Sequence, residues 1–473
     1  MAREKKLPSI PVLLLVLVLF VVIMFGFIVV LELPIQLALL TIWFVIMGVG
    51  LYLGNTYIEM EKGLLKGIYE GLGATLVLIA VGALIGSWIA GGIVPTMIYY
   101  GLSIISPSIF LMAAMVICAI TSISTGTSFG SAGTAGIAMM GIGESFGLPT
   151  YLVAGAVISG CYVGDKMSPL SDTTVMTASL SRVDLFRHIR SMSYVSIPAF
   201  IIAAIAYWIT GLIMQDGSGD LSIAENTMAS LQDTFHISWL MLIPAVVVVV
   251  MLAFKLPSIP VIIFGALLGS LWAVWFQGYG FIEAIETLYS GSGVTTGIDF
   301  IDNLLDRGGI TFMLEVILLI LLALGVGGLL QTIGAFTVIG ELFAKWATNT
   351  GKLTFTTMLA AFFGVFFGGA AYVSMLTGTK ITEANYDKKK ISRTLLSRNV
   401  EAGGTIANPM VPWTDGGVFM ATTLGVSTLA YLPFFWYGFL VIIINLIYGY
   451  FGWFILDKDK YEKEKDEEHE KAI

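Results

Sequence analysis

The stretch Val163–Ala178, VGDKMSPLSDTTVMTA, places a proline and an aspartate inside otherwise apolar sequence. A second stretch, Ile406–Ala421, reads IANPMVPWTDGGVFMA and looks like an edited copy of the first. Both keep Met-x-Pro-x-(Ser/Thr)-Asp, followed by Val-x-x-Ala. Proline breaks a helix, and a carboxylate is costly in apolar surroundings. Because the costly pair occurs twice, we expect it to serve a function.

The composition is that of a helical membrane protein. Of the 473 residues, 57% are hydrophobic and 12% are charged, whereas soluble proteins carry about 25% charged residues. Apolar runs of the roughly 20 residues needed to cross a bilayer recur along the chain, the first beginning at Ile10. This first run has no small-residue cleavage site, so we interpret it as a retained helix. Cys118 and Cys161 lie in apolar sequence, and we expect no disulfide and no metal cofactor.

We therefore predict an all-α polytopic membrane protein with about ten transmembrane helices and two re-entrant hairpins. The predicted spans are 10–32, 34–54, 71–92, 149–178, 193–214, 238–254, 258–276, 310–335, 394–425 and 434–456. The segments 107–146 and 353–379 carry small residues at mid-length, which favours hairpins that enter and leave on one side. The alternative is that each segment is a pair of ordinary spans.

The distribution of Lys and Arg predicts the orientation. With both termini in the cytoplasm, the inner segments hold 22 of the 24 basic residues, and Arg307 and Lys166 are the exceptions. The outer segments 215–237 and 277–309 hold nine acidic residues and Arg307. We predict a multi-pass protein of the cell membrane with cytoplasmic termini, and a charged, partly disordered cytoplasmic tail at 457–473.

The chain also aligns with itself at an offset of 243 residues. Small, polar or helix-breaking residues coincide at this offset, including Gly126 with Gly369 and Gly160 with Gly403. We predict a first repeat at 1–214, an extracellular linker at 215–237 and a second repeat at 238–456. Each repeat has five spans and a hairpin, so the second enters the membrane from the opposite side. Inverted repeats of this kind are typical of secondary transporters.

The two prolines predict broken helices at mid-membrane, at about 149–178 and 394–425. Pro169 and Pro412 each remove a backbone donor, which leaves polar backbone groups that an ion or water must satisfy. Asp172 and Asp415 lie three residues after the prolines. An ionisable residue within a membrane span is a functional candidate, and hard cations prefer oxygen ligands. The alternative is that Pro and Asp cap two ordinary helices at the membrane surface.

We predict a Na⁺ site at Asp172, built from the oxygens of both breaks and both hairpin tips. The hairpin segments, TSISTGTSFGSAGTAG from Thr121 and GGAAYVSMLTGT from Gly368, also suit plain close packing of helices. The predicted ion-binding residues are Asp172, Asp165, Ser171, Thr173, Asp415, Thr414, Ser124, Thr125, Thr127, Ser374 and Thr377, with further hydroxyls at Ser168 and Thr174. The predicted supporting residues are Lys166, Pro169, Pro412, Asn408 and Glu401.

The two breaks differ in charge. Asp165 and Lys166 of the first correspond to Asn408 and Pro409 of the second. We therefore expect the titrating site to lie near the first break, with Lys166 as a salt-bridge partner of Asp165, because buried charges need pairing.

The motif GDKMSPLSDTT, the segment STGTSFGS and the predicted inverted layout resemble the NhaC-type Na⁺/H⁺ antiporters over nearly the whole chain. The resemblance implies exchange of Na⁺, with Li⁺ as an alternative ion, for H⁺ across the plasma membrane by alternating access. It also implies elevator-type movement, a homodimer and no cofactor. The same family includes Na⁺- and H⁺-coupled malate/lactate antiporters, which is the alternative function.

Other classes of protein fit less well. Intramembrane aspartyl proteases need Gly-x-Gly-Asp, but here the sequence before Asp165 reads Tyr162-Val163-Gly164. Repeated broken helices favour alternating access over a channel. We therefore expect no enzymatic activity and no nucleic-acid partner. For the antiporter we predict that Na⁺ and H⁺ compete for the buried Asp172, because either one offsets the cost of its charge in the membrane.

Overall fold

The computed structural model describes residues 5–70, 72–214, 222–254, 256–294, 302, 305 and 308–455. These residues form helices and connecting turns, with no strand among them. The all-α fold predicted from the apolar runs is therefore confirmed. The predicted tail at 457–473 lies outside the described residues.

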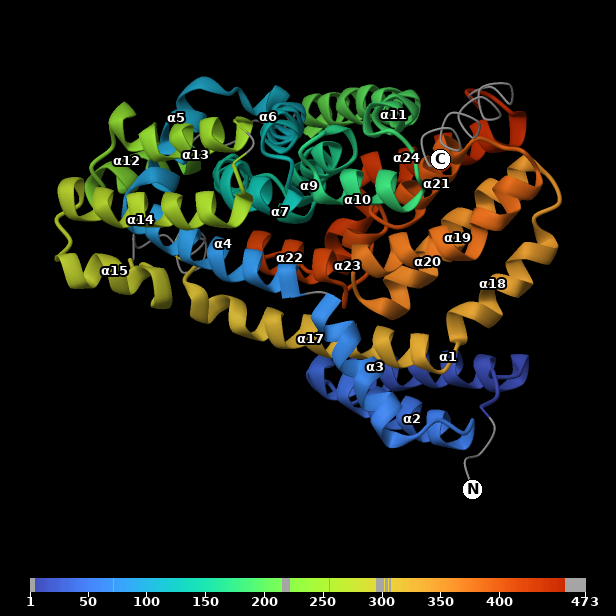
Figure 1. Cartoon of the computed structure of the whole chain (residues 1–473). Helices are drawn as coiled ribbons and strands as arrows, with labels where there is room; N and C mark the ends of the chain where they lie inside the picture. The colour runs from blue at the N-terminus through green and yellow to red at the C-terminus, as the bar shows by residue number, and fades with distance from the viewer. Residues whose placement is uncertain are drawn as a thin grey trace, which may run out of the picture.

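The first half of the chain runs from α1 to α11 (Figure 1). Its helices are α1 (Ile10–Phe25), α2 (Ile35–Tyr52), α3 (Tyr57–Glu70), α4 (Leu72–Ala90), α5 (Ile93–Ile104), α6 (Phe110–Thr125), α7 (Ser128–Ser131), α8 (Ile137–Ser145), α9 (Thr150–Met167), α10 (Asp172–Leu180) and α11 (Leu185–Met214). Short 3₁₀ or π segments lie at Gly26–Val30, Pro107–Ile109 and Ala132–Gly136.

The second half repeats much of this order of helices. Its helices are α12 (Ser222–Thr234), α13 (Ile243–Ala253), α14 (Ser258–Phe276), α15 (Phe281–Ser290), α17 (Ile310–Thr332), α18 (Ala335–Trp346), α19 (Thr350–Gly368), α20 (Ala371–Lys388), α21 (Arg393–Gly403), α22 (Asp415–Leu424), α23 (Thr428–Tyr431) and α24 (Trp436–Phe451). Turns of 3₁₀ helix lie at Trp239–Leu242, Asn408–Met410 and Leu432–Phe434.

Seven helices among the described residues are long and apolar enough to cross a membrane. Three further pairs are bent by 67°, 88° and 89° at short breaks, and counting each pair as one span gives up to ten. The prediction of about ten spans agrees with this upper count in number, although no candidate among the described residues covers the predicted span 149–178. The first arm of each predicted hairpin is itself long enough, at Pro107–Thr125 and Thr350–Gly368. The re-entrant path and the inversion of the second half stay predictions.

Several segments that the charge pattern treats as loops are helical. Helix α3 occupies most of the 55–70 segment, the 336–352 segment contains most of α18, and α12 lies within 215–237. The predicted hairpin at 353–379 is also longer, because its second arm α20 continues to Lys388. These helices carry too many polar residues to be recognised as helices from hydropathy. Helix α3 is strongly amphipathic, and its apolar side is available for packing.

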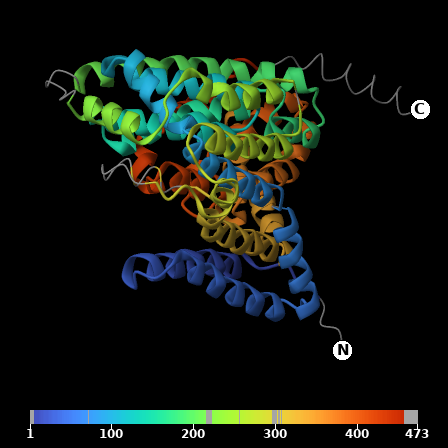
Figure 2. The ribbon, with the colours of Figure 1, turned by 90° about the vertical axis from the view of Figure 1, so that its left-hand side faces the viewer.

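Several helix pairs link the halves, and two of them illustrate how they pack. Helix α3 packs along α17, and α15 packs along α4. The backbones of α3 and α17 approach closely, since a Cβ at Gly67 would lie 2.8 Å from Gly328 Cα. Small residues at such crossings allow close helix packing within membranes. The hairpin of α1 and α2 projects from the main body (Figure 2).

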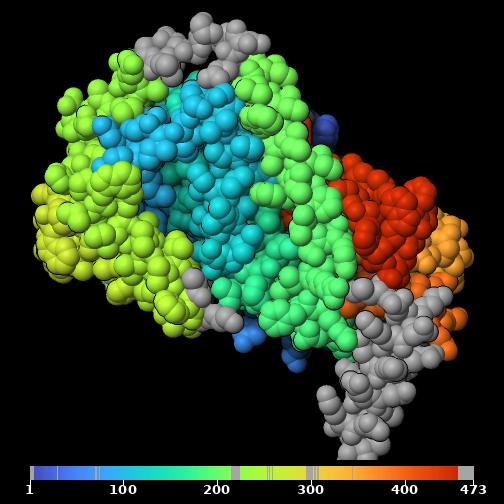
Figure 3. All heavy atoms as spheres, turned by 90° about the horizontal axis from the view of Figure 1, so that it is seen from above, coloured from blue at the N-terminus to red at the C-terminus, as the bar shows by residue number. Residues whose placement is uncertain are grey.

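The broken helices occur where the prolines predict them. Helix α9 ends at Met167 and α10 begins at Asp172, while α21 ends at Gly403 and α22 begins at Asp415. Ser171 and Thr414 are the N-caps of the second pieces, and each side chain accepts from a backbone amide in the first turn. Cap hydroxyls satisfy donors that a new helix start leaves open. Helix α11 lies beside α6 on the upper face and packs over this region (Figure 3).

Candidate functional site

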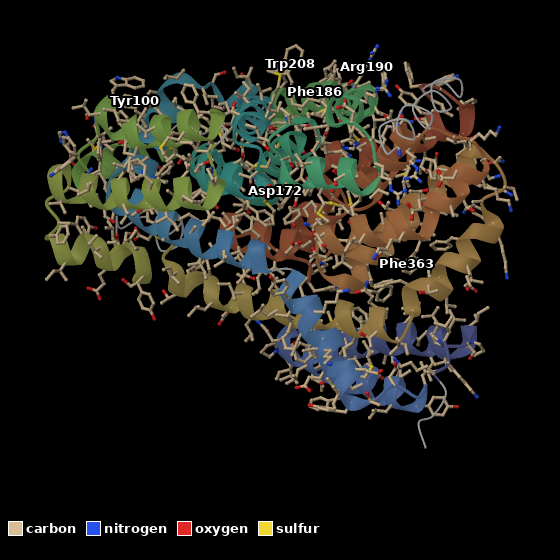
Figure 4. All side chains as sticks on the ribbon, in the orientation of Figure 1. Tyr100, Asp172, Phe186, Arg190, Trp208 and Phe363 are labelled. Atoms are coloured by element: carbon tan, nitrogen blue, oxygen red, sulfur yellow. The ribbon has the colours of Figure 1, made fainter. Side chains whose placement is uncertain are left out.

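Both breaks and both hairpin tips face a single cavity of about 290 Å³. Its lining includes Gly126, Thr127, Ser128 and Phe129 from the first tip and Ala370, Ala371 and Tyr372 from the second. The first break contributes Asp165, Ser171, Asp172 and Thr173, and the second region contributes Thr405, Asn408 and Asp415. Figure 4 labels Asp172, the first residue of α10, near the middle of the molecule. Segments far apart in the chain therefore meet at one place, since Gly73 and Asp415, which are 342 positions apart, both line the cavity.

The first hairpin tip is attached to the first break. The backbone amide of Ser128 donates to Asp165 Oδ1 at 3.0 Å, and the Asp165 side chain is buried. Gly126 turns the chain at the tip with φ of 72°, and a Cβ there would lie 2.6 Å from the Leu170 backbone. The Ser168 hydroxyl donates to the backbone carbonyl of Ile123 at 2.7 Å. The tip and the break therefore form one compact unit.

Three hydroxyls converge on the backbone carbonyl of Asp165. Ser171 donates to this oxygen at 3.1 Å, Thr173 at 2.9 Å and Thr174 at 2.6 Å. These bonds satisfy a carbonyl that the break releases from its helix, as a membrane interior requires. The hydroxyls also gather four oxygens within a small space beside the cavity, which is the donor set that a hard cation prefers.

Asp172 is the most accessible of the three cavity carboxylates. It is the first residue of α10 and is exposed, whereas Asp165 and Asp415 are 7% and 6% exposed. The hydroxyls of Ser171 and Thr173, predicted as ligands beside Asp172, are directed to the Asp165 carbonyl instead. The assignment of Na⁺ to Asp172 stays a prediction, and Asp165 presents a more enclosed carboxylate.

The second break repeats this arrangement with less charge. The Thr414 hydroxyl donates to the Asn408 carbonyl at 2.5 Å, as Ser171 does to Asp165. The Asp415 amide donates to Gly369 O at 2.8 Å, which attaches this break to the second hairpin tip. The Asp415 carboxylate accepts from the Gly416 amide at 2.8 Å. A carboxylate at a helix N-terminus is stabilised by the helix dipole.

The cavity lining is negative. Asp165, Asp172 and Asp415 contribute carboxylates, and no Lys or Arg is among the described residues that line it. Like charges near one another favour binding of cations or protons, which lower the cost of ionised carboxylates in an enclosed site. The cavity is therefore suited to cations and to protons.

The structure separates the predicted ion-binding residues into two groups. Those that line the cavity are Asp165, Ser171, Asp172, Thr173, Thr127 and Asp415, together with the supporting residue Asn408. Those outside the lining are Ser124, Thr125, Ser374, Thr377 and Thr414, together with Lys166, Pro169, Pro412 and Glu401. Thr377 instead lines a separate cavity of about 450 Å³ between α18 and α20. Pro169 and Pro412 lie within the breaks themselves.

The predicted salt bridge between Lys166 and Asp165 is not formed. Lys166 is fully buried, and within the described part of the chain its Nζ has no hydrogen-bond partner. The opposite charge that acts on it belongs to Glu401. Neighbouring residues of a helix point about 100° apart, so Lys166 faces away from the cavity that Asp165 enters.

Two residues of the site, Ser128 and Thr405, were not predicted from the sequence. The amide of Ser128 binds Asp165, but a backbone donor leaves no mark on the sequence. Thr405 lines the cavity two residues after Gly403, and a lone threonine in a small-residue segment is a weak signal. The helix break after Gly403 could have drawn attention to it.

Helix ends that face a polar cavity from two broken helices are the arrangement by which secondary transporters bind ions and substrates. The fold and the cavity thus define a membrane carrier. The sequence pattern of the Na⁺/H⁺ antiporter family matches residues 160–453. With this match and relatives that align over most of their length, the chain belongs to the Na⁺/H⁺ antiporter family.

Three relatives show the range of this likeness. The Malate-2H(+)/Na(+)-lactate antiporter of Bacillus subtilis (strain 168) is 50% identical over 96% of this chain and 97% of its own. The Arginine/ornithine antiporter ArcD of Halobacterium salinarum is 36% identical, covering 87% and 86%. The Na(+)/H(+) antiporter NhaC of Alkalihalophilus pseudofirmus is 35% identical, covering 85% and 87%. All three are named as antiporters, in agreement with a transport role rather than an enzymatic one.

Proposed function

We propose that this antiporter exchanges malate for lactate across the cell membrane, coupled to H⁺ and Na⁺. The observation that carries the proposal is the 50% identity to the Malate-2H(+)/Na(+)-lactate antiporter along almost the full length of both chains. The NhaC relative is 35% identical over a smaller share. Malate/lactate exchange, the alternative function that the family resemblance implies, is therefore preferred to plain Na⁺/H⁺ exchange.

The cavity chemistry supports obligatory coupling. Its volume of about 290 Å³ is close to the roughly 300 Å³ at which small-molecule sites begin. An organic anion that enters this space needs compensating positive charge, because the described lining residues include three carboxylates and no base. In this proposal, Na⁺ or protons supply that charge. They lie between the carboxylates and the substrate, or they bind to the carboxylates themselves. The anion is then bound only together with its coupling ions.

The proposed cation site is formed by Asp165 and Asp172, with hydroxyls of the first break and hairpin tip, and Asp415 supports it from the second break. Sodium and a proton compete for these carboxylates, since both neutralise the same charge. The empty ionised site is costly to move through the membrane, so the loaded forms cross. The proposal places both termini in the cytoplasm and includes a homodimer that moves by an elevator mechanism.

A second candidate function is Na⁺/H⁺ exchange without an organic anion. The specific observation in its favour is the cavity itself, which presents carboxylates and hydroxyls but no cationic side chain to bind an anion among the described lining residues. Such a lining offers the oxygen ligands that a cation needs, without requiring an organic anion.

Purified protein in liposomes distinguishes the two candidates. Vesicles contain lactate, Na⁺ and a pH dye, and labelled malate is added outside. We expect malate uptake that requires both internal lactate and Na⁺, and little pH change when Na⁺ alone is supplied. Full Na⁺-driven pH change without malate uptake would instead support plain Na⁺/H⁺ exchange. Vesicles without protein and vesicles with internal gluconate serve as controls.

A further inference from the structure

A second polar cluster lies outside the lining of the cavity. It consists of Glu401 on α21, Lys166 on α9 and His188 on α11, and all three side chains are fully buried. Among the described residues, Lys166 Nζ, His188 Nε2 and both carboxylate oxygens of Glu401 have no hydrogen-bond partner. Buried polar groups without partners are costly, and such sites in native proteins call for an explanation.

The hydrogen bonds around His188 favour a neutral ring with its proton on Nδ1. The Ser397 hydroxyl donates to the Thr394 carbonyl at 3.1 Å, so its oxygen is free to accept from His188 Nδ1 at 2.8 Å. A neutral His188 with its proton on Nδ1 presents a lone pair at Nε2. That Nε2 lies 4.0 Å from Glu401 Oε1. A lone pair thus faces a carboxylate, and the two attract one another only with a proton between them.

Two cations lie at or near Glu401. Lys166 is the cation that attracts its carboxylate, and the positive charge of Arg398 lies close to Lys166. Arg398 itself donates to the Phe454 carbonyl at 3.1 Å. The other titratable or polar side chains that the packed helices direct toward this region are Asp165 of α9, Thr177 of α10, Tyr386 of α20 and Tyr437 of α24, while the charged residue of α19, Lys352, lies over the Trp346 ring.

Thr405 connects this cluster to the cavity. Thr405 lines the 290 Å³ cavity, and its hydroxyl lies beside the Glu401 carboxylate. A hydroxyl can accept a proton from one side and donate one to the other. The cavity is therefore separated from Glu401 by a single side chain, although Glu401 does not line the cavity.

We propose that Glu401 and His188 form a proton-binding site, distinct from the cation site in the cavity and reached through Thr405. A proton from cavity water adds to the Glu401 carboxylate, and the resulting acid faces the Nε2 lone pair of His188. The same proton leaves by the reverse route. The inference rests on the proposed proton-coupled exchange, and it adds one proton to the one that competes with Na⁺.

Two measurements on the full chain test the site. In the first, infrared difference spectra of purified protein between acid and alkaline pH detect carboxylic acids that titrate. We expect Glu401→Gln to remove one such band and His188→Gln to shift its midpoint. The matched control is Glu315→Gln, which changes an exposed carboxylate of a spanning helix and should leave the band unchanged. A titrating band that persists unaltered in Glu401→Gln would overturn the assignment.

The second measurement is the ratio of protons to malate in liposomes, obtained from the pH gradient at which malate flux reverses. Losing one proton per cycle should lower malate accumulation about tenfold per pH unit of gradient, because one proton per pH unit is worth about 1.4 kcal/mol. An unchanged ratio would refute the site. The infrared measurement needs no malate. If the protein does not transport malate, the proposed function is refuted, and the infrared result still tests the proton-binding site.

Folding of the variant is tested by a compensated pair. Glu401→Gln leaves Lys166 buried without its opposite charge, which is destabilising. The double variant Glu401→Gln with Lys166→Met removes both charges at similar volume. It should restore a folded protein and still lack the titrating band and the second proton. A double variant that retains both would overturn the proposal.

Discussion

The backbone amide of Ser128 donates a 3.0 Å hydrogen bond to the carboxylate of Asp165, and it joins the tip of one hairpin to the end of a broken helix. The bond holds the negative charge in place at the cavity wall. It also means that a movement of either element changes the environment of that charge. A displacement of the hairpin tip would therefore alter binding at the cavity.

The first prediction removes this donor. Ser128→Pro deletes the amide, and proline is tolerated at the first position of a helix after an extended residue such as Thr127. A hydrogen bond to a charged group contributes about 1.5–3 kcal/mol, so we expect Na⁺ affinity to fall by roughly tenfold or more. Sodium binding to purified protein by calorimetry measures it. Ser128→Ala is the control, because it lacks the hydroxyl but keeps the amide, and equal affinities in the two variants would contradict the role of the bond.

The second prediction concerns Asp172. Asp172→Asn should abolish Na⁺-coupled flux in liposomes, while the protein still folds and inserts, because the side chain is exposed at the first position of α10. The loss of a favourable charge at a helix N-terminus costs only about 0.3–1 kcal/mol. Asp172→Glu keeps the charge and should retain part of the flux. Flux near the wild-type level in Asp172→Asn would place the cation at Asp165 instead.

The third prediction concerns pH. A proton and Na⁺ that compete for one carboxylate make the apparent Na⁺ affinity fall about tenfold for each unit of decreasing pH, since one pH unit corresponds to about 1.4 kcal/mol. The sign follows because protonation at low pH removes the charge that binds Na⁺. Sodium titrations of purified protein between pH 6 and 9 provide the measurement. An affinity independent of pH over this range would exclude competition at a shared site.

The fourth prediction uses two glycines with the same backbone conformation. Gly126 and Gly147 have φ of 72° and 69°, but only a Cβ at Gly126 meets other atoms, at 2.6 Å from the Leu170 backbone. Gly147→Ala should therefore cost about 1 kcal/mol for the left-handed conformation alone. Gly126→Ala should lower the melting temperature further and reduce transport, because the hairpin tip must move away from the break. Equal effects of both substitutions on transport would show that this contact is not needed.

The sequence by itself determined the class of fold and the places where it is interrupted. Hydropathy and the distance between apolar runs are local properties, and they predict an all-helical membrane protein with about ten spans. Pro169 and Pro412 mark the two breaks for an equally local reason, because proline disrupts the turn that contains it. The amphipathic α3 was interpreted as a loop, because its apolar side is supplied with a partner only when α17 packs against it.

Tertiary structure alone decided which side chains share a space. Ser128 reaches Asp165 across 37 positions of the chain, through a backbone group that any residue other than proline would offer. Lys166 follows Asp165 directly, and the sequence predicts that the two form a salt bridge. The opposite charge that acts on Lys166 instead belongs to Glu401, from the other half of the chain. The reason is helix geometry: successive residues point about 100° apart, so one of these neighbours faces the cavity and the other faces the buried cluster behind it.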